Sequence, residues 1–199
     1  MPPAKSTVPQ AVFQLKITLK DSSPPIWRRV QVAADVTLAW LHDLIQLAFG
    51  WTDSHLHQFI IGNQAYSIPS PDDWEPVKDE RRFKLNQFLS SPKDKIRYEY
   101  DFGDDWMHEV LLEKILPPEP GVRYPVCVTG KNACPPEDVG GVWGYAGFLE
   151  AITQPDHPEH DQYLEWVGDE FDPKAFDLEA VNQDLEALRR GGRRRQQVR

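Results

Sequence analysis

The strongest concentration of polar side chains surrounds one short turn, where three aspartates and a histidine occur within eight residues: Asp101, Asp104, Asp105 and His108. Carboxylates and an imidazole at this spacing can hold a divalent cation such as Mg²⁺ or Mn²⁺, or act as acid and base. Aspartate is also a preferred residue of tight turns, and His108 alternates with Trp106 and Val110 on what would be an apolar face. A ligand site that includes Trp106, and a structural turn with a core histidine, are both open interpretations.

A second group of residues has the side-chain types of a zinc site. His55 and His57 are two residues apart on a predicted strand, so their side chains point to one face. Cys127 and Cys134 add thiols, although six residues between cysteines is not the short spacing of zinc knuckles. Phe59 continues the face of His57, so a histidine packed at the core edge is the alternative to a metal ligand.

Residues 134–141 form an unusual segment, Cys-Pro-Pro-Glu-Asp-Val-Gly-Gly. The prolines stiffen it and the glycines permit positive φ angles, with Glu137 and Asp138 between them. We expect either a loop that closes over a groove and contributes these carboxylates to ligand binding, or a rigid connection between a strand and a helix. The sequence has no phosphate-binding or dinucleotide-binding glycine motif, and no residue is assigned a catalytic role.

The chain is rich in aromatic residues, with 7 Trp, 6 Tyr and 9 Phe. Five tryptophans lie near turns or polar segments: Trp51, Trp74, Trp106, Trp143 and Trp166. Exposed aromatic side chains at such positions favour recognition of a protein or peptide partner. The alternative is that most of them are core residues, since aromatic side chains supply much of the buried area of any domain.

Charge is distributed unevenly along the 199 residues, whose formal net charge is −9. Residues 137–186 contain 14 acidic residues and one basic residue, whereas residues 189–199 contain six arginines and no acid. Phosphate binding depends on clustered basic residues, so nucleic acid is a possible partner only through Arg189–Arg199. A solvated terminus without a partner is the alternative.

Composition excludes several classes of protein. No apolar run approaches the roughly 20 residues of a membrane span, and the first residues lack the apolar core of a secretory signal. Two cysteines are too few for a scaffold built from disulfides. We therefore expect a cytoplasmic protein without a membrane partner.

Apolar periodicity predicts an α+β fold. Alternation predicts strands near residues 13–19 and 26–32, and the helical spacing of Leu38, Leu41 and Ile45 predicts a helix between Thr37 and Gly50, which gives a ββα opening. Further alternation predicts a mostly antiparallel sheet, followed by a helical, acidic C-terminal third. This predicts the following strands, loop and helices: strands at 56–61, 65–68 and 124–129, a polar loop at 69–82, a hairpin at 96–112, and helices at 144–153, 162–167 and from Asp177. One domain is expected at 11–188, between a disordered segment (1–10) and a disordered Arg-rich tail (189–199).

Several motifs in this order resemble those of one family. They are Trp27-Arg28-Arg29, Leu41-His42-Asp43, Phe49-Gly50-Trp51, His55-Leu56-His57-Gln58-Phe59, Tyr98 to Trp106 with His108, and Cys134 to Gly141. The chain resembles the plasmid pRiA4b ORF-3-like proteins over roughly residues 11–185. The resemblance implies a passenger protein of plasmids or other mobile elements. The activity of this family is not established, and its members are sometimes labelled TnpR. A resolvase would need a serine or tyrosine nucleophile among arginines, and no such arrangement is found in the sequence.

Three functional hypotheses follow. The leading one is a non-enzymatic binding or adaptor module. The second is a metal-dependent hydrolase or nuclease that uses Asp101, Asp104, Asp105 and His108, with His55, His57, Glu137 and Asp138 as further candidates. The third is a DNA-associated regulator that binds through the arginine tail.

Overall fold

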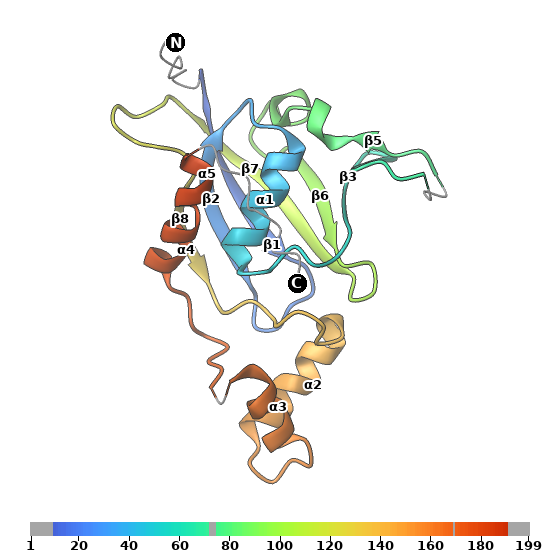
Figure 1. Ribbon diagram of the computed structural model, residues 1–199. Helices are drawn as coiled ribbons and strands as arrows, with labels where there is room; N and C mark the ends of the chain where they lie inside the picture. Colours follow the sequence, from blue (N-terminus) through green and yellow to red (C-terminus); the bar gives the residue numbers. More distant parts are fainter. Residues whose placement is uncertain (1–9, 72–74, 169, 191–199) are drawn as a thin grey trace.

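An eight-stranded sheet forms the centre of the protein (Figure 1). The computed structural model describes residues 10–71, 75–168 and 170–190. The spatial order of the strands is β5-β4-β3-β6-β7-β1-β2-β8, and every neighbouring pair is antiparallel except β4 and β5. The strand bounds are β1 Val12–Leu19, β2 Trp27–Ala33, β3 His57–Ile61, β4 Gln64–Ser67, β5 Lys78–Asp79, β6 Lys95–Tyr100, β7 Trp106–Leu116 and β8 Val126–Lys131. The predicted α+β class and mostly antiparallel sheet are confirmed.

The first helix, α1 (Leu38–Phe49), completes the predicted ββα opening. The Thr37 side chain accepts from the amide of Trp40 at 3.2 Å, which caps the first turn. Gly50 ends the helix in the left-handed region at a φ of 82°, which glycine adopts without steric cost.

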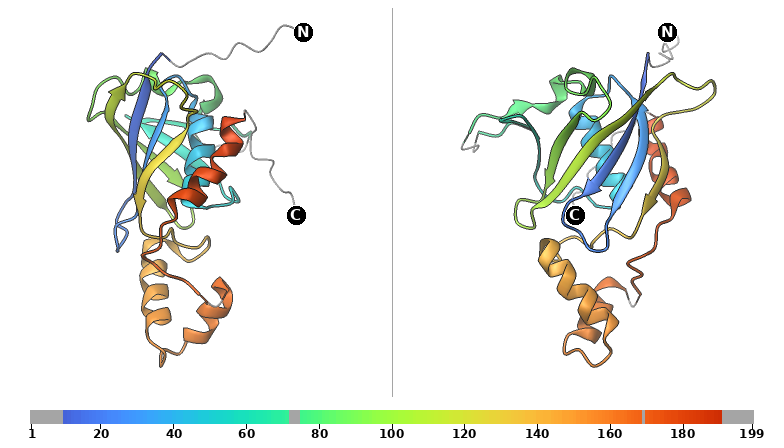
Figure 2. Two further views of the ribbon diagram at one scale, coloured as in Figure 1. Left: turned by 90° about the vertical axis from the view of Figure 1, so that its left-hand side faces the viewer. Right: turned by 180° about the vertical axis from the view of Figure 1, so that it is seen from behind.

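The core lies between α1 and one face of the sheet. Leu41, Leu44 and Ile45 of α1 are buried against strand residues such as Leu15 and Val110. Figure 2 shows α1, α4 and α5 on the same side of the sheet. The period of two along the strands therefore separates a core face from a more polar face, as the sequence alternation predicted.

The other helices follow β8. They are α2 Gly141–Thr153, α3 His160–Val167, α4 Leu178–Asp184 and α5 Glu186–Arg189. Helices α2 and α3 pack on each other beyond the end of the sheet (Figure 1), and α4 lies along β8. The Asn182 side chain accepts from the amide of Cys127 at 3.0 Å and donates to its carbonyl at 2.9 Å, which satisfies part of the edge of β8.

The stretch predicted as a polar loop at 69–82 is partly structured. It contains β5 and the 3-10 helix η1 (Glu80–Arg82), and a second 3-10 helix, η2 (Leu85–Gln87), follows. Residues 72–74 of this stretch, including Trp74, lie outside the described residues. Two-residue strands and single helical turns are too short to leave a periodic signal in a sequence.

The predicted terminal segments fall mainly on residues 1–9 and 191–199, which lie outside the described residues. Arg189 is described, as the last residue of α5. Within the described part of the chain, no helix combines the length and apolar character needed to cross a bilayer.

Candidate functional site

The loop at residues 134–141 is attached both to the residues after α1 and to the turn between β6 and β7. The indole nitrogen of Trp51 donates to the carbonyl of Pro135 at 3.1 Å. The amide of Gly140 donates to the Asp104 carboxylate at 3.1 Å. The 134–141 loop, the residues after α1 and the turn between β6 and β7 therefore meet at one end of the sheet.

Glu137 holds this loop in place through both of its carboxylate oxygens. One oxygen accepts from the Tyr100 hydroxyl, and the other accepts from the amide of Thr52 at 3.2 Å and from the Thr52 hydroxyl. Burial and the nearby Glu137 carboxylate raise the pKa of Tyr100 far above its ordinary value, so the hydroxyl remains a donor at neutral pH. Because its oxygens are already engaged, Glu137 acts here as a positioning residue.

His55 lies between two aspartates that come from the other two segments. Its Nδ1 is 3.6 Å from Oδ2 of Asp101, and its Nε2 is 3.1 Å from Oδ1 of Asp138. The Asp101 side chain is 11% exposed and the Asp138 side chain 72%, so the group extends from the protein interior to solvent. Each of the three residues offers a potential metal-ligand atom within 4.8 Å of the other two. We call these three residues the His55 cluster.

The four residues predicted to act together around the turn do not face one point. His108 is fully buried on the core face, with Nδ1 2.9 Å from the Trp106 carbonyl oxygen. Burial lowers the pKa of His108 to about 3, so its imidazole is neutral at physiological pH. Asp105 is exposed and the Asp104 carboxylate is engaged by Gly140. His108 and Trp106 thus take the core role that the alternation offered as the alternative.

The two cysteines are free thiols and are not grouped with His55 and His57 as metal ligands among the described residues. Cys127 is buried in β8, and burial raises its pKa to about 11. Burial also raises the pKa of Cys134. Thiolates are the zinc-binding form, and these environments disfavour them. The predicted zinc site of two histidines and two cysteines is therefore not assembled in this structure.

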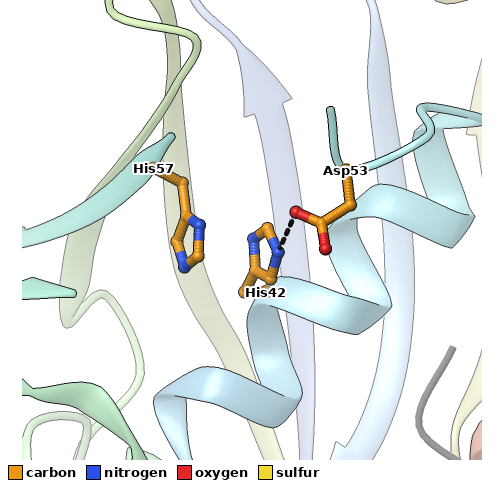
Figure 3. Close-up of side chains that lie close together, drawn as sticks. All are labelled: His42, Asp53 and His57. Atoms are coloured by element: carbon orange, nitrogen blue, oxygen red, sulfur yellow. Dashed lines mark hydrogen bonds and ion pairs between the residues drawn. The ribbon is translucent and has the colours of Figure 1, made fainter. Parts of the chain in front are cut away.

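His57 faces the core, where its ring stacks on that of His42 from α1 (Figure 3). The ring centroids are 3.4 Å apart and the ring planes differ by 6°. His57 Nε2 is 3.0 Å from Oε2 of the buried Glu80, and burial lowers the pKa of His57 although that contact opposes the shift. A parallel stack of two imidazoles is compatible with neutral rings, because two adjacent imidazolium ions would repel each other.

A closed ring of hydrogen bonds holds His42 in this position. Gln46 donates to the Tyr98 hydroxyl at 3.1 Å, and that hydroxyl pairs with His42 Nδ1 at 2.8 Å. His42 Nε2 pairs with Asp53 Oδ1 at 2.9 Å, and the amide of Asp53 returns to Gln46 Oε1 at 3.0 Å. Each of the four residues therefore contributes two hydrogen bonds to the ring, and satisfied bonds of this kind stabilise a buried polar network.

His42, Asp53 and His57 also offer potential ligand atoms within 4.8 Å of one another. However, imidazole lone pairs lie in the ring plane, so two parallel stacked rings cannot both direct a nitrogen at one ion about 2.1 Å away. Both nitrogens of His42 are in addition already hydrogen-bonded. This arrangement is a buried structural network rather than a metal centre.

Asp53 and Glu80 leave no signal in the sequence as partners of this network. Only His42 leaves a signal, because it falls four residues after Leu38 on the apolar stripe of the predicted helix. Its carboxylate partner Asp53 lies after the helix, and Glu80 lies in a 3-10 turn far along the chain. Their contacts depend on tertiary packing.

The predicted group of exposed tryptophans divides into two sets. Trp51 and Trp106 are core residues, whereas Trp143 is 87% exposed and Trp166 is 46% exposed. Two other large apolar side chains near the His55 cluster are also exposed, Leu56 at 72% and Phe102 at 49%. We call Leu56, Phe102 and Trp143 the apolar surface; they flank the His55 cluster in the sequence on each of its three segments.

Comparison with known proteins gives consistent results. The family model described as plasmid pRiA4b ORF-3-like protein matches residues 11–180. The uncharacterized protein y4hQ of Sinorhizobium fredii (strain NBRC 101917 / NGR234) is 37% identical over 183 residues, which cover 89% of this chain and 92% of that protein. The crystal structure of a protein of unknown function, MM3350 from Methanosarcina mazei Go1, superposes with a TM-score of 0.79 at 40% identity, covering 87% of this chain and 97% of that one.

Proposed function

The chain belongs to the plasmid pRiA4b ORF-3-like family, and we propose that it works as a binding module that takes up a protein or peptide partner on the apolar surface. The observation that carries this proposal is the exposure of Leu56, Phe102 and Trp143, each of which lies within five residues of a member of the His55 cluster in the sequence. Single exposed apolar side chains are ordinary, but large aromatic side chains are enriched at protein interfaces.

Hydrogen bonds hold the three segments of this surface together. The amide of Asp101 donates to the Leu56 carbonyl at 2.8 Å, which places Leu56 beside the turn that carries Phe102. Trp143 follows two residues after Gly141, at the start of α2, and Gly140 is bonded to the same turn. A partner would therefore meet a pre-organised surface and lose little free energy in ordering it.

The charges near the apolar surface indicate the chemistry of the partner. Asp105 and Asp138 are exposed there, and no lysine or arginine among the described residues pairs with Asp101 or Asp138. We expect a partner segment that combines apolar side chains with at least one lysine or arginine. Full burial of one large apolar side chain contributes about 1.5–3 kcal/mol, so three such contacts contribute about 4.5–9 kcal/mol before the cost of association is subtracted.

The two alternatives from the sequence receive less support. Hydrolysis through Asp101, Asp104, Asp105 and His108 would require His108 at the surface, and it is a core residue. Arg189 is not free to bind nucleic acid as part of the arginine run, because its guanidinium donates to the Pro125 carbonyl and to the Glu186 carboxylate. Of the described residues, that alternative retains the exposed Arg190, and otherwise it depends on residues outside the described part of the chain.

Location and association are part of the same proposal. Two free thiols support a reducing compartment such as the cytoplasm. The name of the family supports an association with plasmids or other mobile elements.

Selection of random peptides displayed on phage against the full chain tests the proposed function. We expect enriched peptides to contain apolar and basic residues, and to bind at least tenfold more weakly to a Phe102→Ser/Trp143→Ser double variant. The matched control is Ile115→Ser/Val128→Ser. These apolar residues are 43% and 39% exposed and lie on strands β7 and β8, outside the apolar surface. Absence of enriched peptides, or equal loss of binding in both double variants, would contradict the proposal.

A further inference from the structure

From the geometry of the His55 cluster we infer a binding site for one divalent transition-metal ion, with Zn²⁺ as the expected occupant. The inference goes beyond the proposed function and does not require it. It rests on three residues that distant parts of the chain supply: His55 before β3, Asp101 after β6 and Asp138 in the 134–141 loop.

Each ring nitrogen of His55 faces a different carboxylate. A neutral imidazole has one N–H donor and one lone pair, so it can satisfy only one of the two aspartates by hydrogen bonding. His55 Nε2 is buried and makes no hydrogen bond, although Asp138 Oδ1 is 3.1 Å away. A nitrogen and a carboxylate oxygen that face each other without a hydrogen bond are placed as two ligands of one cation would be.

The distances agree with this assignment. Ligand atoms about 2.1 Å from an ion are separated by about 3.0–3.4 Å when the angle at the metal lies between octahedral and tetrahedral values. The separation of 3.1 Å between His55 Nε2 and Asp138 Oδ1 falls in this interval. The distance is therefore compatible with one ion bound by His55 Nε2 and Asp138 Oδ1, and the Asp138 side chain is 72% exposed.

Asp101 lies nearest the other ring nitrogen, Nδ1, and offers a carboxylate oxygen within 4.8 Å of the ligand atom of Asp138. Its Oδ2 faces Nδ1 at 3.6 Å, while its Oδ1 accepts from the amide of Gly103 at 3.0 Å. The 3.6 Å separation is longer than a hydrogen bond, so a shift of a few tenths of an ångström would give Nδ1–H the carboxylate contact that usually supports a zinc-bound histidine. Asp101 also adds negative charge within 4.8 Å of the other two groups.

The surrounding charge favours a cation as well. Among the described residues, the ion pairs of Asp101 and of Asp138 involve His55 alone, and no lysine or arginine reaches either carboxylate. The mixture of imidazole and carboxylate ligands favours Zn²⁺ over Mg²⁺ and Ca²⁺, which prefer oxygen ligands alone. Two direct protein ligands leave positions for water or for a donor atom of a partner.

Calorimetric titration of the untagged, chelator-treated full chain with Zn²⁺ alone tests the inference. We expect one Zn²⁺ per chain in the unmodified protein. We expect affinity to fall at least tenfold in both His55→Gln and Asp138→Asn, and by about 10–100-fold in Asp101→Asn, as for other residues that orient a metal-bound histidine. The matched control, Asp156→Asn, removes an exposed carboxylate between α2 and α3 and should bind as the unmodified chain does.

Thermal melting without metal separates loss of the site from loss of the fold. Asp138 is 72% exposed in its side chain, so Asp138→Asn carries the test even if His55→Gln is destabilised. Titration with Co²⁺ adds a spectroscopic readout, because visible absorption bands report an ion held by protein ligands. The inference is overturned if the unmodified chain binds no Zn²⁺, if tight binding survives in a folded His55→Gln or Asp138→Asn variant, or if Asp156→Asn weakens binding equally.

Discussion

Replacing His108 by asparagine should make the stability of the protein less sensitive to acid. His108 is fully buried, and burial lowers its pKa from 6.5 to about 3. The native state therefore binds fewer protons at this position than the unfolded chain does between pH 6.5 and pH 3. The stabilisation is complete above pH 6.5 and is lost progressively as the pH falls toward the lowered pKa.

The size of the effect follows from the two pKa values of His108. Each pH unit in this window changes the free energy of unfolding by about 1.4 kcal/mol, so between pH 7 and pH 5 His108 alone removes about 2 kcal/mol of stability. Asparagine can place its amide near the Nδ1 position and keep the bond to the Trp106 carbonyl, but it does not titrate. The smaller side chain leaves a void, so we expect the variant to be about 1–3 kcal/mol less stable at pH 7.

Urea denaturation of both proteins at pH 7 and at pH 5 measures the difference. The window lies above the range where Asp94 and Glu113, whose pKa values are lowered by hydrogen bonds, lose their stabilisation. His57 also has a lowered pKa and destabilises the fold as the pH falls, but it is present in both proteins and cancels. The pH-dependent loss should be about 2 kcal/mol smaller in the variant. Equal losses in the two proteins would refute the burial of a neutral imidazole at this position.

Two further predictions concern the attachment of the 134–141 loop. Gly141→Ala should destabilise the fold by about 2 kcal/mol or more, because φ at Gly141 is +67° and an added Cβ would lie 2.4 Å from the Asp104 carbonyl oxygen. The control is Gly147→Ala in the same helix, whose Cβ would meet nothing within 4 Å and which should stabilise the fold by up to about 1 kcal/mol. Urea denaturation measures both variants, and equal effects would contradict the close contact at Gly141. Trp51→Phe removes the indole donor to Pro135 and should cost about 1–3 kcal/mol, with faster hydrogen exchange in the loop; unchanged exchange would show that this bond does not hold the loop.

Local sequence signals predicted much of the fold. The ββα opening follows from alternation in β1 and β2 and from the capped, amphipathic α1, all of which are patterns within a dozen residues. The order of the strands could not be predicted in the same way, because β1 pairs with β7, and the paired residues lie 89 (Leu19 and His108) to 104 (Val12 and Leu116) positions apart in the sequence. That choice depends on which apolar faces pack together, and single-residue patterns do not record it.

The types of residue in the candidate site could be recognised in the sequence, but which of them lie together could not. The sequence singles out His55, Asp101 and Asp138 in three separate motifs. The hydrolase hypothesis requires these motifs to converge, but their spacing in the sequence does not predict that they do. Spacing of two residues put His55 and His57 on one face, whereas the structure places His57 in the core and His55 before the strand begins. A spacing of two residues places side chains on one face only within a regular strand, and β3 begins at His57, so the rule does not apply to His55.

The buried histidine stack and the His55 cluster are coupled by the register of the sheet. His57 is paired with Tyr100 across β3 and β6, and the Asp101 amide bonds to the Leu56 carbonyl, so Asp101 is next to His55 only in this register. A shift by one residue would turn His57 away from His42 and expose the polar network of the core, which is costly. The stack on α1 therefore fixes β3 in position, and that position places His55 between Asp101 and Asp138. A substitution of His42 should therefore alter metal binding at the His55 cluster, which His42 does not contact. If the surface residues alone formed the cluster, the same substitution would leave metal binding unchanged.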